Sequence, residues 1–98
     1  MFDKMKQLME MQKKMQLVKR ELESATFDSL SSDGLIKITM NGAQEVKEVS
    51  IQADLRTTDK TVFEKSVKDA YNKAIKRSHD LAAEKMRNVT GFNLPGLT

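Results

Sequence analysis

Two long stretches without glycine or proline constrain the fold of this chain more than any other feature. One spans residues 3–23 and the other residues 59–90, and both are rich in good helix formers. Between them, residues 35–51 alternate apolar and polar side chains, which is the period of a half-buried strand. Ninety-eight residues are enough for one small core. We therefore predict a single α+β domain, residues 1–98, in which two helices flank a small sheet.

The first predicted helix, about residues 3–23, carries an apolar seam. Its residues recur at intervals of three and four, the spacing of a heptad: Leu8, Met11, Met15, Val18 and Leu22. Four of the seven methionines lie between residues 5 and 16. A thioether copper site would need several sulfurs to converge, whereas these spread over several turns. We expect them to fill space between helices, in the core or a dimer interface. We expect no metal and no cofactor.

The second predicted helix, about residues 59–90, is longer than the sheet it must cover. It would measure roughly 45 Å, whereas strands of six or seven residues measure about 20 Å. Its apolar stripe runs along the whole length: Phe63, Val67, Ala70, Tyr71, Ala74, Ile75, Ala82, Met86 and Val89. Two helices with surplus apolar surface predict a homodimer. The candidate core or interface residues are Leu8, Met11, Met15, Val18, Leu22, Ile75, Ala82, Met86 and Val89.

The sheet is predicted to have three antiparallel strands, at about residues 25–29, 35–41 and 44–52. Asn41-Gly42 predicts a two-residue type I′ hairpin turn, because both residues tolerate positive φ. Alternation places Val49 and Ile51 on one face and Val46 on the other, which predicts a bulge or register shift near the turn. The C-terminal tail, residues 91–98, is apolar at Phe92, Leu94, Pro95 and Leu97. It either folds back on the helices or docks on a partner.

Composition and motifs exclude several classes of protein. There is no cysteine, so disulfides and thiolate metal sites are excluded. No apolar run approaches the ~20 residues of a transmembrane helix, and charges interrupt the N-terminus, so we expect a cytoplasmic protein without membrane contact. The run Ser78-His79-Asp80 cannot form a catalytic relay, since consecutive helical side chains point about 100° apart. We expect His79 to be partly buried. We predict neither an enzyme nor a small-molecule substrate.

The charges separate along the chain. Residues 1–23 carry six Lys/Arg against four Asp/Glu, residues 24–58 carry three against five, and residues 59–98 carry eight against five. Opposite the seam of the first helix lie Lys6, Lys13 and Arg20, flanked by Lys14 and Lys19. On the second helix an eleven-residue spacing aligns Lys65, Lys76 and Arg87, with Lys73 nearby. Asp69 and Asp80 could pair there with Lys65 and Lys76. Both basic ridges are either solvated faces or phosphate contacts.

Several segments together resemble the YbaB/EbfC family of bacterial nucleoid-associated proteins. They are the C-terminal "EKMRNVTGFNLPGL", the hairpin "GLIKITMNGAQEVKEVSI" and the first helix "MKQLMEMQKKMQ", in the same order of elements. The family usually has a glycine-rich approach to the hairpin, and here it reads Ser31-Ser32-Asp33-Gly34. The resemblance implies an α-β3-α fold, a tweezer-like homodimer, and binding of double-stranded DNA with little sequence requirement.

Together these features predict a homodimer whose basic helical arms straddle double-stranded DNA at the nucleoid, organising it and affecting gene expression. The candidate DNA contacts are Lys6, Lys13, Lys14, Lys19, Arg20, Lys65, Lys73, Lys76 and Arg87. The alternative is a dimeric adaptor or scaffold that binds another protein, with incidental DNA binding. The modest net charge of +3 and the interleaved acidic residues favour this alternative.

Overall fold

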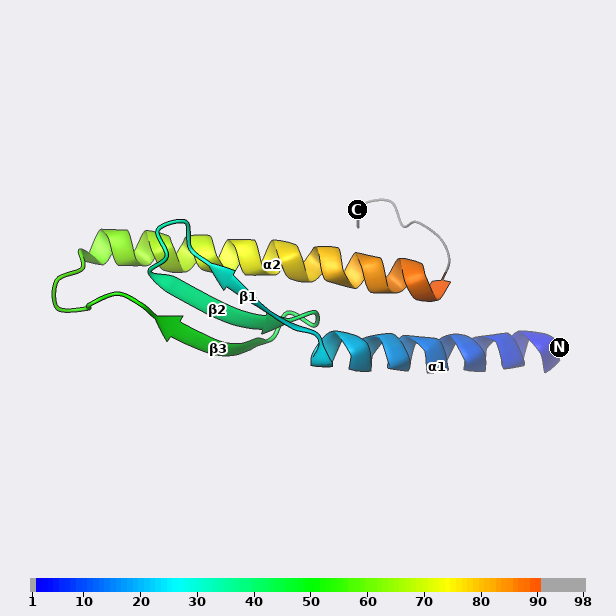
Figure 1. The fold of residues 1–98 in the computed structure, drawn as a ribbon. Coiled ribbons are helices and arrows are strands. Elements are labelled where there is room, and N and C mark those ends of the chain that lie inside the picture. Colours follow the sequence, from blue (N-terminus) through cyan, green and yellow to red (C-terminus); the bar gives the residue numbers. More distant parts are fainter. Residues whose placement is uncertain (1, 91–98) are drawn as a thin grey trace.

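The computed structural model of the protein describes residues 2–90, without the side chains of Val89 and Thr90. Its elements, in chain order, are α1 (Phe2–Ser24), β1 (Thr26–Leu30), β2 (Ile36–Asn41), β3 (Val46–Ile51) and α2 (Lys60–Thr90). The strands form one antiparallel sheet in the order β1-β2-β3 (Figure 1). The predicted α-β3-α class is confirmed. The predicted tail contacts of residues 91–98 lie outside the described residues.

Helix α2 covers one face of the sheet and then continues beyond it alongside α1, which runs in the opposite direction (Figure 1). The molecule is therefore elongated, 67 × 23 × 15 Å. Its core lies between α2 and the inward face of β1 and β2, where small alanines let the helix approach the sheet closely. The core consists of Phe27, Ile36, Ile38, Met40, Ala70 and Ala74.

The turn between β2 and β3 differs from the predicted type I′ turn. Neither Asn41 nor Gly42 has positive φ; the residue in the left-handed region is Gln44, with φ of 63°. The amide of Gln44 donates to the carbonyl of Asn41 (3.2 Å), and the amide of Asn41 donates to the carbonyl of Glu45 (3.1 Å). Three residues, 42–44, therefore form the loop instead of two.

The predicted register shift next to this turn is confirmed. Thr39 pairs with Glu48, whereas Met40 pairs with Val46, so Lys47 is the extra residue of a bulge. Directly opposed residues of two strands share a face of the sheet. The bulge therefore returns Val46 to the face on which Val49 lies.

The loop between β1 and β2 fastens the sheet to α2. Asp33 accepts hydrogen bonds from the hydroxyls of Ser31 (2.6 Å) and Ser66, and the amide of Ser32 donates to the carboxylate of Asp69 (2.7 Å). The Ser31 bond, followed by the Ser66 bond, lowers the pKa of Asp33 from its ordinary value. The bond from the Ser32 amide does the same for the pKa of Asp69. Both carboxylates therefore hold the loop in place, Asp33 from within the loop and Asp69 from α2.

Candidate nucleic-acid interface

Helix α1 is an arm that is packed at one end only (Figure 1). Val18 is 3% exposed and Met15 and Leu22 are half-buried, but Met11 is 49% and Leu8 is 65% exposed. Exposure rises toward the N-terminus of α1 because α2 lies beside only the C-terminal half of α1. The N-terminal half therefore projects alone. On α2, half-buried positions of the predicted set are Ile75, Ala82 and Met86. The side chain of Val89 lies outside the described part.

The arm leaves most of its methionines open. Met5 and Met9 are exposed like Met11, and only Met15 is half-buried. Within one protomer, Met5, Met9 and Met11 therefore fill no space between helices, and their expected packing in a dimer interface stays a prediction. Packing against a second molecule is the remaining role for these methionines.

The cations of the arm are exposed and form no ion pair with the described part of the chain. Lys6, Lys13 and Arg20 lie on the side of α1 opposite the buried Val18, and none forms an ion pair with the described residues. Lys4, Lys14 and Lys19 are also exposed and form no ion pair with the described residues. Of the helix's charged groups, only Glu21 has such a partner among residues 2–90, namely Lys85 at 3.8 Å. The six cations are thus available to an anionic ligand.

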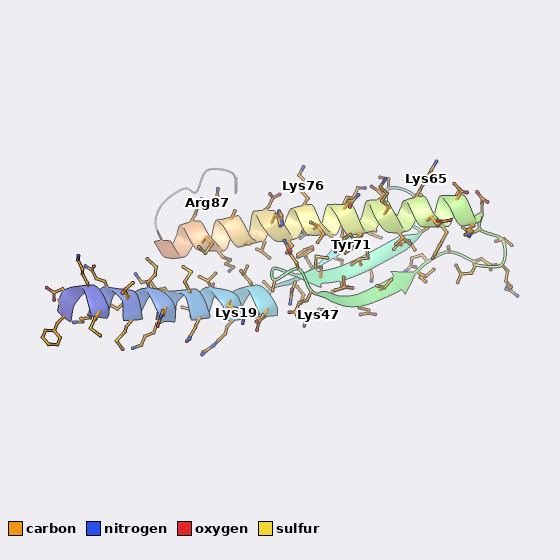
Figure 2. The ribbon with its side chains drawn as sticks, turned by 180° about the vertical axis from the view of Figure 1, so that it is seen from behind. Lys19, Lys47, Lys65, Tyr71, Lys76 and Arg87 are labelled. Carbon is orange, nitrogen blue, oxygen red and sulfur yellow. The ribbon has the colours of Figure 1, made fainter. Side chains whose placement is uncertain are left out.

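The second basic ridge projects from the side of α2 that faces away from the sheet and from α1 (Figure 2). Lys65, Lys76 and Arg87 point to this side. The expected pairs with Lys65 and Lys76 are not formed: Asp69 pairs with Lys73 instead (3.3 Å), and Asp80 has no ion pair within the described range.

Two of the candidate cations on α2 are less available than the others. The ammonium of Lys73 contacts Asp69 and also donates to the hydroxyl of Ser32 (2.7 Å). Arg87 is half-buried. Lys65 and Lys76 are exposed, so they are the more accessible cations of this ridge.

The two basic ridges lie on opposite sides of the protomer. The α1 ridge faces away from α2, and the α2 ridge faces away from α1, so two helix diameters of about 10 Å each separate them. The open face of the sheet, which faces away from α2, carries Asp28 and Glu48 beside Lys37, so acidic groups interrupt any basic surface there. One straight duplex therefore cannot lie along both ridges of one protomer.

Several structural roles have no clear signal in the sequence. Ser78 is fully buried and donates to the carbonyl of Asn41 (3.0 Å), whereas His79 is exposed, so the expected partial burial of His79 is wrong. Arg77 lies over the ring of Phe27 (4.8 Å to its centre) and donates to the backbone carbonyl of Asp28 (3.1 Å). Arg77 thereby covers part of the free edge of β1.

Two absences apply to residues 2–90. No helix among them is long and apolar enough to cross a membrane. No group of three or more His, Cys, Asp or Glu side chains in this range is arranged to hold a metal ion.

Comparisons with known proteins agree on the family. Residues 1–93 match the model of the YbaB/EbfC DNA-binding family. A nucleoid-associated protein of Hahella chejuensis (strain KCTC 2396) is 38% identical over 96 residues, covering 97% of this chain and 89% of that protein. The crystal structure of an uncharacterized protein from Helicobacter pylori has the same fold, with a TM-score of 0.72, 21% identity, and coverage of 93% and 94% of the two chains.

The chain belongs to the YbaB/EbfC DNA-binding family. The family consists of nucleoid-associated DNA-binding proteins and not of enzymes, which confirms the prediction that this chain is not an enzyme.

Proposed function

We propose that the protein is a homodimeric nucleoid-associated protein that grips double-stranded DNA with its α1 arms, largely independently of sequence. One observation carries the proposal: all six Lys/Arg side chains of α1 are exposed and have no ion-pair partner among residues 2–90. Membership of a DNA-binding family supports it, as does the relative that is named a nucleoid-associated protein.

The binding energy would come mainly from phosphates. Lys6, Lys13 and Arg20 recur every seven residues, so they rise about 10 Å per step along the arm. Each phosphate that they neutralise releases counterions, which makes affinity fall steeply with salt. Sequence preference would arise from DNA shape and deformability, not from base contacts. Lys14 and Lys19 would add contacts at the flanks.

The α2 ridge has a secondary role in this proposal. It lies on the other side of the protomer, so Lys65, Lys76 and Arg87 would meet a different segment of DNA from the one held by α1. Among the candidate DNA contacts of α2, Lys73 is the least available, because its ammonium already contacts Asp69 and Ser32.

The dimer would form through an apolar surface that one protomer leaves uncovered, which we call the β3 face. Helix α2 packs mainly on β1 and β2, and β3 carries exposed Val46, Val49 and Ile51 on the same face of the sheet. Tyr71, which lies on the side of α2 toward the sheet (Figure 2), and Val67, four residues before it on the same helix, are exposed apolar groups of α2 that would extend this surface. A second copy would supply the missing layer over β3. It would also provide the second arm that a clamp on DNA needs.

Such a clamp would act in the cytoplasm on the nucleoid. Binding along many sequences would influence how DNA is folded and how genes on it are expressed. This consequence follows from sequence-independent binding and two arms per dimer.

Fluorescence anisotropy with a random-sequence duplex of about 30 base pairs tests which ridge binds. Lys6, Lys13 and Arg20 would be changed together to Glu. A matched variant would change to Glu the two accessible cations of the α2 ridge, Lys65 and Lys76, together with Lys68, another exposed lysine of α2. Both variants alter the net charge equally. We expect the α1 variant to lose binding and the α2 variant to keep most of it. Equal losses in both would show that only total charge matters and would overturn the arm assignment.

The adaptor function has one specific observation in its favour. The arm exposes Phe2, Met5 and Met9 in addition to its cations, and exposed flexible apolar groups suit protein partners. A pull-down from nuclease-treated lysate, repeated with Met5 and Met9 changed to Gln, tests it. A partner that survives nuclease and is lost with these substitutions would favour the adaptor; one that is lost with nuclease would favour DNA.

A further inference from the structure

The side chain of Asn41 joins the end of α1 to the β2–β3 hairpin. Asn41 is fully buried. Its Nδ2 donates to the backbone carbonyl of Glu23 (3.0 Å) and to Oε1 of Glu45 (2.9 Å). Its Oδ1 accepts from the amides of Ala43 (3.0 Å) and Glu45 (3.0 Å). Both donor hydrogens and both acceptor positions of the amide are used, which holds the group in one orientation.

The backbone at the same position completes the junction. The amide of Gly42 donates to the carbonyls of Leu22 (2.9 Å) and Ala25 (3.1 Å), so the last turn of α1 is capped by the hairpin. A Cβ at Gly42 would lie 2.6 Å from Cδ2 and 3.2 Å from the carbonyl oxygen of Leu22, so glycine permits this close approach. The buried hydroxyl of Ser78 donates to the carbonyl of Asn41 (3.0 Å), which brings α2 into the same junction.

We propose that Asn41, Gly42 and Ser78, together called the arm anchor, set the direction of α1 and so hold its cations in register with DNA. These are positioning residues, since none of them faces the ligand. The consequence for DNA rests on the proposed function, but the control of arm direction does not.

A small change of angle at this junction moves the N-terminal end of α1 by several ångströms. Glu23 and Lys6 are 17 residues apart on α1, which is about 25 Å. A tilt of about 10° at the anchor would move Lys6 by about 4 Å, comparable with the rise of about 3.4 Å along the DNA axis from one phosphate of a strand to the next. Packing alone provides little restraint on the outer arm, because Leu8 and Met11 are exposed. The packing of α1 beside α2 near Val18 and the anchor at the C-terminal end of α1 therefore together fix where the cations point.

Distances between two spin labels measure the arm direction without DNA. The chain has no cysteine, so Gln7→Cys on the arm and Asn72→Cys on α2 can be labelled selectively. Both positions are exposed. An excess of unlabelled chain removes distances between protomers. The measurement would be made in the parent, in Asn41→Ala and in a control, Ser66→Ala. The control removes another buried hydroxyl of α2, one that bonds to Asp33 far from the arm.

We expect a narrow distance distribution in the parent and in Ser66→Ala, and a broad or shifted one in Asn41→Ala. DNA affinity should fall about tenfold in Asn41→Ala, as expected when contacts worth about 1.4 kcal/mol are misaligned. A parent-like distribution in Asn41→Ala, or equal broadening in the control, would overturn the proposal.

Gly42→Ala provides an independent test if Asn41→Ala does not fold. It keeps every hydrogen-bonding group and adds one methyl group against Leu22. The arm distance should shift, and an unchanged distance in this variant would contradict the proposal. If the parent itself does not bind DNA, the proposed function fails, while the label distances still decide whether the anchor controls the arm.

Discussion

Replacing Val49 with Asp should separate the dimer while leaving the protomer folded. Val49 is 54% exposed at the centre of the β3 face, so the protomer loses little when it is changed. In the dimer, the substitution would remove roughly 1 kcal/mol of apolar burial and add about 1–3 kcal/mol for a buried polar group, in each of two copies. The dimer should lose at least about 4 kcal/mol, or a factor of about a thousand in Kd.

Leu30→Asp is the matched control for this prediction. Leu30 is 52% exposed on β1 but pairs with Lys37 on the opposite face of the sheet. Light scattering over a concentration series would give the masses, with circular dichroism to verify folding. The parent and Leu30→Asp should have twice the 11.1 kDa of one chain, and Val49→Asp should have the mass of one chain. A monomeric parent at about 100 μM, or an undiminished dimer in Val49→Asp, would refute the assignment of the β3 face.

Two predictions concern the stability of the protomer. Folding lowers the pKa of Asp33, so near that pKa this carboxyl binds fewer protons in the folded state than in the unfolded chain. The stability that Asp33 contributes to the fold is complete above its ordinary pKa of 3.8 and is lost as the pH falls through the lowered pKa. Urea unfolding should show this acid-dependent loss in the parent and a flatter profile in Asp33→Asn; parallel profiles would contradict it. Arg77→Ala should cost about 1–2 kcal/mol, since it removes the contact with Phe27 and the bond to Asp28, and Arg77→Lys should restore less than half of this. Equal unfolding midpoints for Arg77→Ala and the parent would contradict it.

The fold could be predicted because its determinants are local and periodic. The seam of α1, the alternation of β2 and the stripe of α2 each depend on spacing along one element. The register shift at Val46 was also visible, because Val46 interrupts the alternation that Val49 and Ile51 follow. These features give the order and type of the elements without knowledge of their neighbours.

The turn could not be predicted in detail because tertiary contacts determine it. Asn41-Gly42 is typical of a type I′ turn on local grounds. In the protein, the side chain of Asn41 is used to bond α1 and Gly42 is needed for close approach to Leu22. The positive φ therefore falls at Gln44, which no local preference indicates.

The arrangement of the candidate site was also beyond sequence reasoning. Spacing identifies the ridge of each helix, but not that the two ridges face opposite sides of the protomer. The pair of Asp69 with Lys73 was missed although its spacing, with the acid four residues before the lysine, is the favoured one on a helix. The sequence does not show that Ser32 of a distant loop also holds Lys73. The exposure of Met5, Met9 and Met11 depends on where α2 ends relative to α1, which is a property of the packed fold.

The salt dependence of DNA affinity tests the central claim most directly. Three ridge cations on each of two arms give about six phosphate contacts, so the slope of log affinity against log salt should approach about −5. Changing Lys6, Lys13 and Arg20 to Glu should abolish that slope together with the binding. A slope shallower than about −2 for the parent, or a slope that survives these substitutions, would contradict the account of α1 as a phosphate-binding arm.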